Sequence, residues 1–326
     1  MFFQKNDFYD SFIYQKIKKE FIGESIQELE GGTENKSFLI SGKIVLRVLF
    51  INHRSIVYDS AELLILREVL IVNELYNKGI NSMCYNEFSN GQYYQLFNVK
   101  LGKIFFLQYN FIEGIHLQYD EVSVINVARC INNMHKAIQS MDLGNYYVKE
   151  YDDLVSCLHH RHFRFNPEVS TYIQNYRYYF NFFLENTRLL KNFKSINKNN
   201  FIHGDLHCKN LLGSNVLCFI DFGDIRNSVI EEELGIFLWG MSLEVLSHHQ
   251  LEKLMNTFLD CYADKEKLVN KEFCLRYAVQ RYLDIHMFYL DSNLKDDNKM
   301  KYQVNKFDNE RPQIDFFIEE IHKYEQ

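Results

Sequence analysis

With 326 residues, of which 47% are hydrophobic, the chain is long and apolar enough for one large domain or two lobes, which excludes an intrinsically disordered protein. Its 36 Lys and Arg residues against 43 Asp and Glu give a formal charge of −7, so the charge balance disfavours nucleic acid or an acidic membrane surface as a partner. The seven cysteines include no C-x-x-C pair, which argues against zinc or disulfide exchange and indicates reduced thiols.

The first ten residues lack the basic and apolar regions of a signal peptide, and the most apolar stretch, residues 44–51, is interrupted by Arg47. We therefore expect a cytoplasmic protein, monomer or homodimer, that binds neither a membrane nor nucleic acid.

The N-terminal part of the chain has strand-like patterns separated by glycine-containing turns. The apolar periodicity of residues 59–77 instead predicts a helix. The strand-like segments are residues 25–30, 35–40, 43–51, 93–99 and 103–111. Together they predict a five-stranded antiparallel sheet with one helix.

Beyond Gly114 the apolar spacing becomes helical, and it predicts long helices over residues 120–139, 168–193 and 273–291. The chain lacks a Gly/Ser-rich linker, so a short hinge must join the two parts. We expect an α+β protein with a first lobe at residues 1–112 and a mainly helical second lobe at residues 113–326.

The most informative segment is FIHGDLHCKNLL at residues 201–212, followed by LCFIDFGD at residues 217–224. Asp205 precedes Asn210 by five residues, so one polar loop can present a carboxylate to a nucleophilic hydroxyl and an amide oxygen to a metal ion. Asp221, at the end of a short apolar strand, adds a second hard oxygen ligand of the kind that magnesium requires.

These two motifs resemble the aminoglycoside phosphotransferase and choline kinase superfamily, whose signature is H-x-D-x-x-x-x-N followed by I-D-F/W. The resemblance implies a bilobal, protein-kinase-like fold that uses ATP or GTP with Mg²⁺. It assigns the catalytic carboxylate to Asp205, the magnesium ligands to Asn210 and Asp221, and structural support of the loop to His203. The first lobe would then bind the nucleotide, and the second would carry the catalytic loop and the acceptor site.

The resemblance extends to the first lobe. EGGTENKSF at residues 30–38 is similar to the nucleotide loop between the first two strands, where glycines let backbone approach phosphate. An arginine replaces the commoner lysine of the third strand, and its expected partner is Glu68, eleven residues before Gly79, with Glu62 as the alternative. The implied nucleotide-binding positions are Gly31, Gly32, Thr33, Asn35, Arg47 and Glu68, with main-chain groups at Asn110 and Ile112 in the hinge.

The stretch DFGDIRNSVIEEELG after the second motif resembles hydroxylysine-kinase-like members, and homoserine kinase-type enzymes are a further comparison. This alignment starts the next helix at Glu233. Acidic residues after the metal-binding strand, Glu233 and Asp284 among them, are candidate acceptor-binding groups, so we expect a small hydroxylated acceptor that carries an amine.

Three alternatives stay open from the sequence. The chain lacks an activation segment ending in A-P-E, but some relatives of this fold phosphorylate protein Ser or Thr. A catalytically silent nucleotide-binding scaffold is the second alternative. A zinc site at His203 and His207 is the third, although the glutamate of H-E-x-x-H is missing.

Overall fold

The computed structural model describes residues 7–29, 36–53, 55, 58–143, 172–197, 200–213, 217–263, 269–293 and 296–325. The chain divides into two compact units, Met1–Gly114 and Ile115–Gln326, which are taken in turn below. In the described part of the chain, no helix combines the length and the hydropathy needed to cross a bilayer.

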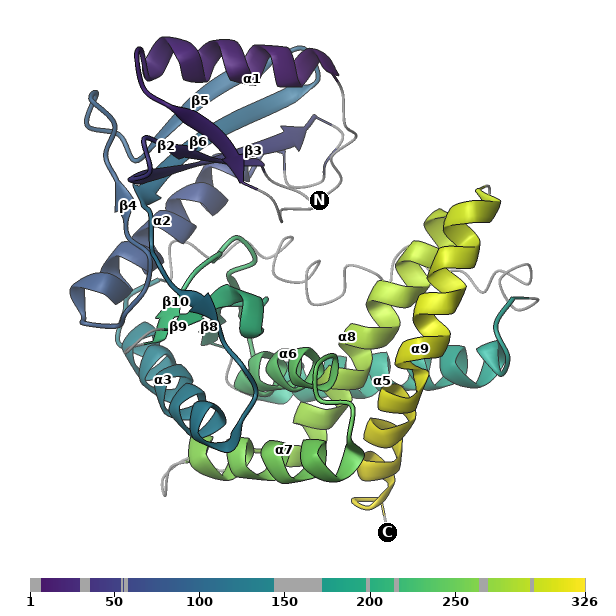
Figure 1. Ribbon diagram of the computed structural model, residues 1–326. Coiled ribbons are helices and arrows are strands. Elements are labelled where there is room, and N and C mark those ends of the chain that lie inside the picture. Colours follow the sequence, from purple (N-terminus) through teal and green to yellow (C-terminus); the bar gives the residue numbers. More distant parts are fainter. Residues whose placement is uncertain are drawn as a thin grey trace. The chain divides into compact units, whose positions relative to one another are not determined.

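The first unit contains a mixed set of elements (Figure 1). Its helices and strands are α1 (Asp7–Glu20), β1 (Ile26–Leu29), β2 (Lys36–Ile40), β3 (Ile44–Asn52), α2 (Ala61–Asn77), β4 (Tyr85–Asn86), β5 (Tyr94–Val99) and β6 (Gly102–Asn110). The strands form one antiparallel sheet in the order β1-β2-β3-β6-β4, with β5 also paired to β6. The predicted antiparallel sheet is therefore confirmed.

Two details of this unit differ from the expectation. The sheet has six strands rather than five, because the two-residue strand β4 is too short to show a period in the sequence. A second helix, α1, precedes the sheet and buries Ile13 and Ile17, one turn apart, on it. Figure 1 shows α1 lying along one face of the sheet.

Consecutive residues of the central strand β3 are buried. Because neighbouring side chains point to opposite sides of a sheet, this strand is covered on both faces. Leu46 and Val48 pack into the cluster that contains α1. Arg47 points to the other face, where its guanidinium meets Glu68 of α2. The strand thus places one charged side chain within an otherwise apolar run.

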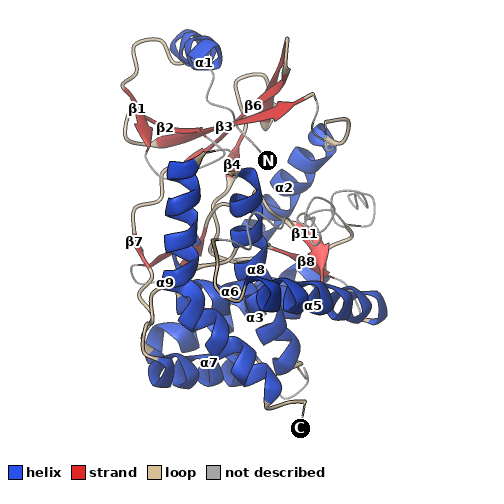
Figure 2. Cartoon of the chain, turned by 90° about the vertical axis from the view of Figure 1, so that its right-hand side faces the viewer, coloured by secondary structure: helices blue, strands red, loops and turns tan. Residues whose placement is uncertain are grey.

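The second unit is mainly helical, as predicted, with short strands among the helices (Figure 2). Its helices are α3 (Glu121–Gln139), α5 (Tyr176–Ile196), the 3₁₀ helix η3 (Cys208–Asn210), α6 (Ile230–Ser242), α7 (His248–Tyr262), α8 (Lys271–Ser292) and α9 (Asp297–His322). Its strands are β7 (Ile115–His116), β8 (Asn200–Ile202), β9 (Leu211–Gly213), β10 (Leu217–Phe219) and β11 (Arg226–Ser228). The three helices expected from apolar spacing correspond to α3, α5 and α8.

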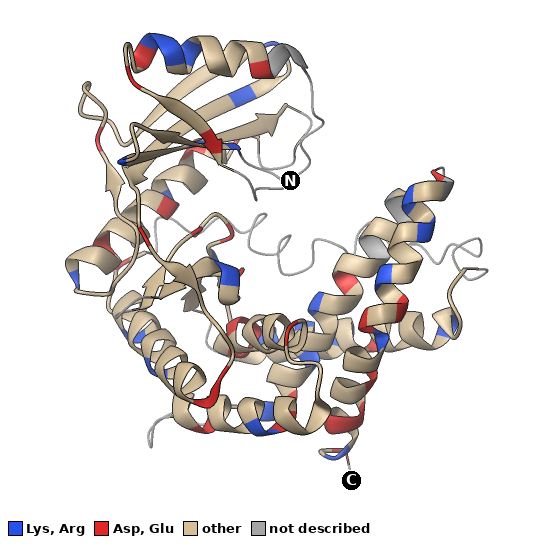
Figure 3. Ribbon diagram, in the orientation of Figure 1, with Lys and Arg blue, Asp and Glu red and all other residues tan. Residues whose placement is uncertain are grey.

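Charges of both signs are distributed along α9 rather than forming a uniformly acidic face (Figure 3). Within this helix Lys306 lies 3.9 Å from Glu310, and Arg311 lies 3.6 Å from Asp308. Such partly exposed surface pairs contribute little to stability, because water screens them.

Candidate active site

The loop that carries Asp205 leaves strand β8, which pairs antiparallel with β11 so that Ile202 lies opposite Arg226. Gly204 has a φ of +88°, in the left-handed region that side chains disfavour. A Cβ atom at this position would lie 2.2 Å from both the Nη1 of Arg226 and the carbonyl oxygen of Asp224. The glycine of H-G-D is therefore required by both backbone conformation and space.

Arg226 holds this loop through hydrogen bonds to its backbone. Its Nη1 donates to the carbonyl oxygens of Gly204 (2.8 Å) and Asp224 (3.1 Å). Its Nε and Nη2 donate to Oε1 of Glu232 at 3.1 and 2.6 Å. Burial raises the pKa of Glu232, but the charges of Arg226 and Lys194 and the hydrogen bond from Ser228 lower it further, so the net shift is downward. The carboxylate therefore stays ionised and keeps the arginine in place.

Glu233 binds the backbone of the loop that carries Asp205, and this corrects the expectation that it contacts an acceptor. The side chain is fully buried in α6, and its carboxylate accepts hydrogen bonds from the backbone N–H groups of His203 and Gly204, the latter at 3.2 Å. The helix begins at Ile230, three residues before the predicted start. A carboxylate so enclosed is bound to the loop rather than exposed to a substrate.

His203 is a buried part of the loop. Its Nε2 lies 2.9 Å from the carbonyl oxygen of Ile220, and its ring centroid lies 4.4 Å from that of Phe222. His207 instead directs its Nε2 toward Asp205. Among the residues that the structure describes, no group of three or more His, Cys, Asp or Glu side chains could hold a metal ion. The zinc alternative therefore has no support in the described part of the chain.

Asp205 and Asn210 are tied to each other across the loop. The Nδ2 of Asn210 donates to the carbonyl oxygen of Asp205 at 2.7 Å. Burial raises the pKa of Asp205, but the hydrogen bond from His207 and the charge of Arg281 lower it more, to about 2. The carboxylate is consequently ionised at neutral pH, as a proton acceptor must be.

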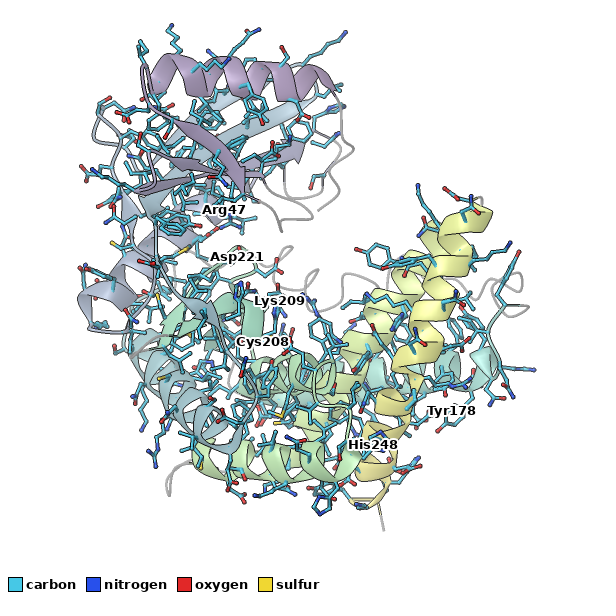
Figure 4. All side chains as sticks on the ribbon, viewed as in Figure 1. Arg47, Tyr178, Cys208, Lys209, Asp221 and His248 are labelled. Carbon is cyan, nitrogen blue, oxygen red and sulfur yellow. The ribbon has the colours of Figure 1, made fainter. Side chains whose placement is uncertain are left out.

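Asp221 lies next to this pair through the backbone, because the N–H of Ile220 donates to the carbonyl oxygen of Asn210 at 3.1 Å. Asp221 is exposed and has a φ of +59°, a conformation that costs energy and is concentrated at functional sites. Figure 4 shows Asp221, Lys209 and Cys208 in the same region of the second unit.

The donor set fits magnesium. Because the amide nitrogen of Asn210 is hydrogen-bonded to Asp205, its carbonyl oxygen is the atom left to bind a cation. The carboxylate of Asp221 is the second hard oxygen donor, and magnesium in nucleotide enzymes commonly takes one or two protein ligands together with phosphates and waters. Asn210 and Asp221 are therefore the residues that could hold the ion.

Asp284, the other candidate acceptor-binding residue, lies on α8. Its Oδ1 accepts a hydrogen bond from Nε2 of Gln280 at 3.1 Å. Burial raises the pKa of this carboxyl from 3.8 to about 7, although the hydrogen bond from Gln280 and the charge of Arg281 oppose the shift. Asp284 is thus poised between its neutral and charged forms near neutral pH.

In the first unit, the arginine of β3 has the partner expected from the sequence. The Nη1 of Arg47 lies 2.6 Å from Oε1 of Glu68, and both side chains are buried. The hydroxyl of Tyr85 donates to the same glutamate oxygen and accepts from Arg47 at 3.2 Å. Glu62, the alternative, instead pairs with Lys103 at 3.1 Å.

The remaining nucleotide-binding predictions concern two loops. Gly31, Gly32, Thr33 and Asn35 lie outside the described residues. Asn110 ends strand β6, and its Oδ1 accepts from Asn86 at 2.9 Å. The next N–H, of Phe111, donates to the carbonyl oxygen of Lys43. Ile112 follows outside the sheet, so the main-chain contact predicted there stays a prediction.

Sequence reasoning missed Arg281 and Trp239. The Nη2 of Arg281 in α8 lies 2.7 Å from Oδ1 of Asp205, and its guanidinium carbon lies 5.3 Å from the centre of the Trp239 ring in α6. More than seventy residues separate Arg281 from Asp205 along the chain, so no local motif connects them. The single tryptophan of the sequence was the one available signal.

Neither a protein-family model nor a curated protein matches the sequence. Solved structures match over nearly its whole length. The structure of amicoumacin kinase hAmiN with AMP-PNP and Ca²⁺ has a TM-score of 0.67 at 15% identity and covers 92% of each chain. A microcompartment-associated aminopropanol kinase has a TM-score of 0.67 at 13% identity, with 91% of this chain and 94% of that chain covered.

APH(2")-IIia, solved with GDP and kanamycin, has a TM-score of 0.64 at 13% identity, with 93% of this chain and 99% of that chain covered. The chain has a protein-kinase-like fold. This agrees with the family resemblance of its catalytic-loop motifs and with its α+β architecture. At such low identity the likeness establishes the fold, and the activity has to be argued from the site.

Proposed function

We propose that the protein is an ATP- or GTP-dependent kinase that transfers the γ-phosphoryl group to a hydroxyl of a small molecule. The observation that carries this proposal is the loop in which Asn210 is hydrogen-bonded to Asp205 and to the backbone next to the exposed Asp221. The similar structures support the nucleotide, because one contains AMP-PNP and another GDP.

The chain's own residues suit an in-line transfer. Asp205 orients the acceptor hydroxyl and takes its proton as the new P–O bond forms. Asn210 and Asp221 would hold magnesium, which supplies positive charge to the phosphate oxygens. Arg47, fixed by Glu68, provides a guanidinium for the α- and β-phosphates. Most of the acceleration would come from positioning and charge neutralisation.

A small-molecule acceptor is favoured over a protein. Only residues 222–229 separate Asp221 from the start of α6 at Ile230, which is too short for a peptide-binding platform of the protein-kinase type. A silent scaffold is disfavoured because Asp205 is retained together with Asn210 and Asp221, and the binding of a magnesium-nucleotide alone does not need the carboxylate of Asp205.

We further propose that the acceptor carries an amine and that Asp284 supplies its counter-charge. The sequence named Glu233 and Asp284 as acceptor-binding candidates. Glu233 accepts hydrogen bonds from the loop backbone, and its neighbour Glu232 pairs with Arg226, so Asp284 is the candidate that remains. One similar structure is a complex with kanamycin and another is choline kinase LicA from Streptococcus pneumoniae, which supports an aminated acceptor.

The test is a screen of ATP and GTP consumption against aminoglycosides, amino alcohols, hydroxy amino acids and sugars. Magnesium-nucleotide affinity is then measured for Asp221→Asn, with Asp260→Asn as the control because that exposed carboxylate lies on α7 and pairs with Lys271. We expect the first variant to weaken both affinity and turnover and the control to alter neither. Nucleotide binding without turnover on any acceptor would favour the scaffold.

A further inference from the structure

Arg281 is the charged side chain that most directly contacts the catalytic carboxylate. Its Nη2 lies 2.7 Å from Oδ1 of Asp205, and both side chains are about one-quarter exposed, at 25% each. Oδ2 of the same carboxylate has more distant neighbours, the Nδ2 of Asn210 at 3.4 Å and the Nε2 of His207 at 3.5 Å. The two carboxylate oxygens are therefore in different environments.

The close packing of α6 against α8 puts Arg281 there. A Cβ atom at Gly235 would lie 2.5 Å from Cβ of Tyr277, so the absence of a side chain lets the two helices approach. Trp239 and Arg281 lie one helical turn beyond Gly235 and Tyr277, on the same respective helix faces. This register brings the guanidinium to the indole ring.

The Trp239 ring is a platform for this guanidinium. The guanidinium carbon of Arg281 lies 5.3 Å from the ring centre, within the range of a cation–π contact. The Nε of Arg281 is buried and has no hydrogen-bond partner among the described residues. Asp205 and the indole are thus the contacts that set the direction of the guanidinium.

We propose that Arg281, seated on Trp239, is a positioning residue for the phosphoryl transfer proposed above, which fixes Oδ1 of Asp205 and leaves Oδ2 to receive the acceptor proton. In that step the hydroxyl oxygen forms a bond to the γ-phosphorus as its proton moves to Oδ2. The bond from the γ-phosphorus to the bridging oxygen breaks, and its electron pair leaves with the nucleoside diphosphate. A single fixed hydrogen bond selects one carboxylate rotamer, which is what this geometry requires.

The kinetic test compares Arg281→Gln, Arg281→Lys and Trp239→Leu with the wild type, and uses Arg188→Gln as the control. Arg188 lies on α5, is 72% exposed and pairs only weakly with Glu185 at 3.9 Å. We expect Arg281→Gln to lower kcat about a hundredfold with an unchanged KM for the nucleotide, since a misplaced catalytic group costs about that much. Arg281→Lys should restore most of the loss, and Trp239→Leu should lie between them.

An unchanged kcat in Arg281→Gln would overturn the proposal, as would a loss that lysine does not restore. A second measurement does not depend on activity. The thermal unfolding midpoints of Arg281→Gln, Asp205→Asn and the double variant should be non-additive, because the two side chains are in contact. Additive shifts would refute the contact itself. If the shifts of these variants are non-additive but the wild-type protein phosphorylates no acceptor, the contact stands and the proposed function is refuted.

Discussion

Two buried arginine–glutamate pairs, one in each unit, have the same N–O distance and different surroundings. Arg47 and Glu68 lie 2.6 Å apart and share the hydroxyl of Tyr85, so this cluster joins β3, α2 and β4 through side chains. Arg226 and Glu232 also lie 2.6 Å apart, but the arginine additionally binds the backbone carbonyl oxygens of Gly204 and Asp224.

The two ion pairs therefore have different structural roles. A buried pair whose arginine also satisfies backbone oxygens determines the shape of a loop, and its removal leaves several polar groups unpaired. The contacts of Arg47 with Glu68 and Tyr85 are with side chains, so we expect this pair to be altered with less damage to the backbone, which suits the nucleotide-binding role proposed for Arg47. The predictions below test this distinction, from the largest expected effect to the smallest.

Arg226→Met should have the largest effect on folding. It leaves the buried Glu232 carboxylate without its cation and the carbonyl oxygens of Gly204 and Asp224 without their donor, and such losses cost about 3–5 kcal/mol. Denaturant unfolding measures the loss. Arg188→Met, at an exposed position, is the matched control and should change the unfolding free energy by less than about 0.5 kcal/mol. Equal effects would show that Arg226 does not hold the loop.

Gly204→Ala should come next. The left-handed backbone costs an alanine about 1–3 kcal/mol, and the added Cβ displaces Arg226. Gly213→Ala is the matched control, because a Cβ there meets nothing within 4 Å. We expect lower stability and lost phosphoryl transfer in the first variant and neither in the second. A stable, active Gly204→Ala would contradict the packing described for the loop.

Asp284 contrasts with Glu232 of the second pair: the pKa of Asp284 is raised, whereas that of Glu232, despite its burial, is lowered by its arginine partner. The charged groups that influence it are Arg281 on its own helix, Glu232 of α6 and Arg226 of β11. A folded-state pKa of about 7, above the ordinary 3.8, gives stability that is complete below pH 4 and is lost as the pH rises through 7. Asp284→Asn should therefore gain stability relative to the wild type between pH 5 and 8.

Thermal unfolding of both proteins at several pH values measures that gain. The exposed Asp260→Asn is the control and should show no such trend. A difference between wild type and Asp284→Asn that does not change with pH would mean that the carboxyl titrates normally.

Arg47→Lys should have the smallest effect. Lysine keeps the charge beside Glu68 and loses the planar fork, so we expect a cost of about 1 kcal/mol and a change in nucleotide affinity of a few fold. Arg226→Lys should cost more, because one ammonium group cannot reach the carboxylate and both backbone oxygens. Calorimetric nucleotide titration and unfolding of the two variants decide the order, and the reverse order would undo the comparison.

Local patterns in the sequence predicted the elements around the site well. The apolar period of residues 59–77 reflects helix geometry, and the continuous apolar run of residues 44–51, interrupted by Arg47, is typical of a strand buried on both faces; they became α2 and β3. The partner of Arg47 could be predicted because the family resemblance supplied a fixed spacing from Glu68 to Gly79. The helix α1 is harder to predict, because its buried hydrophobic residues are two isoleucines, Ile13 and Ile17, within a stretch that contains many charged residues.

Tertiary partners were harder to predict. The sequence suggests an acceptor-binding role for Glu233 because it belongs to an acidic run after the metal-binding strand, whereas its burial depends on how α6 packs against the loop that carries Asp205. Arg281 was not singled out, because its contact with Asp205 depends on the approach of α8 to α6 at Gly235. Neither contact has a sequence period, so only the folded backbone reveals them.

The measurement that tests the central claim most directly is the turnover and nucleotide affinity of Asp205→Asn. The amide keeps the size of the side chain and removes its capacity to accept the acceptor proton, so kcat should fall by about 10²–10⁴-fold. Nucleotide affinity should stay within a few fold of the wild type, because the proposed role of Asp205 is toward the acceptor. Retention of more than about a tenth of the wild-type turnover would contradict the assignment of Asp205 as the catalytic carboxylate.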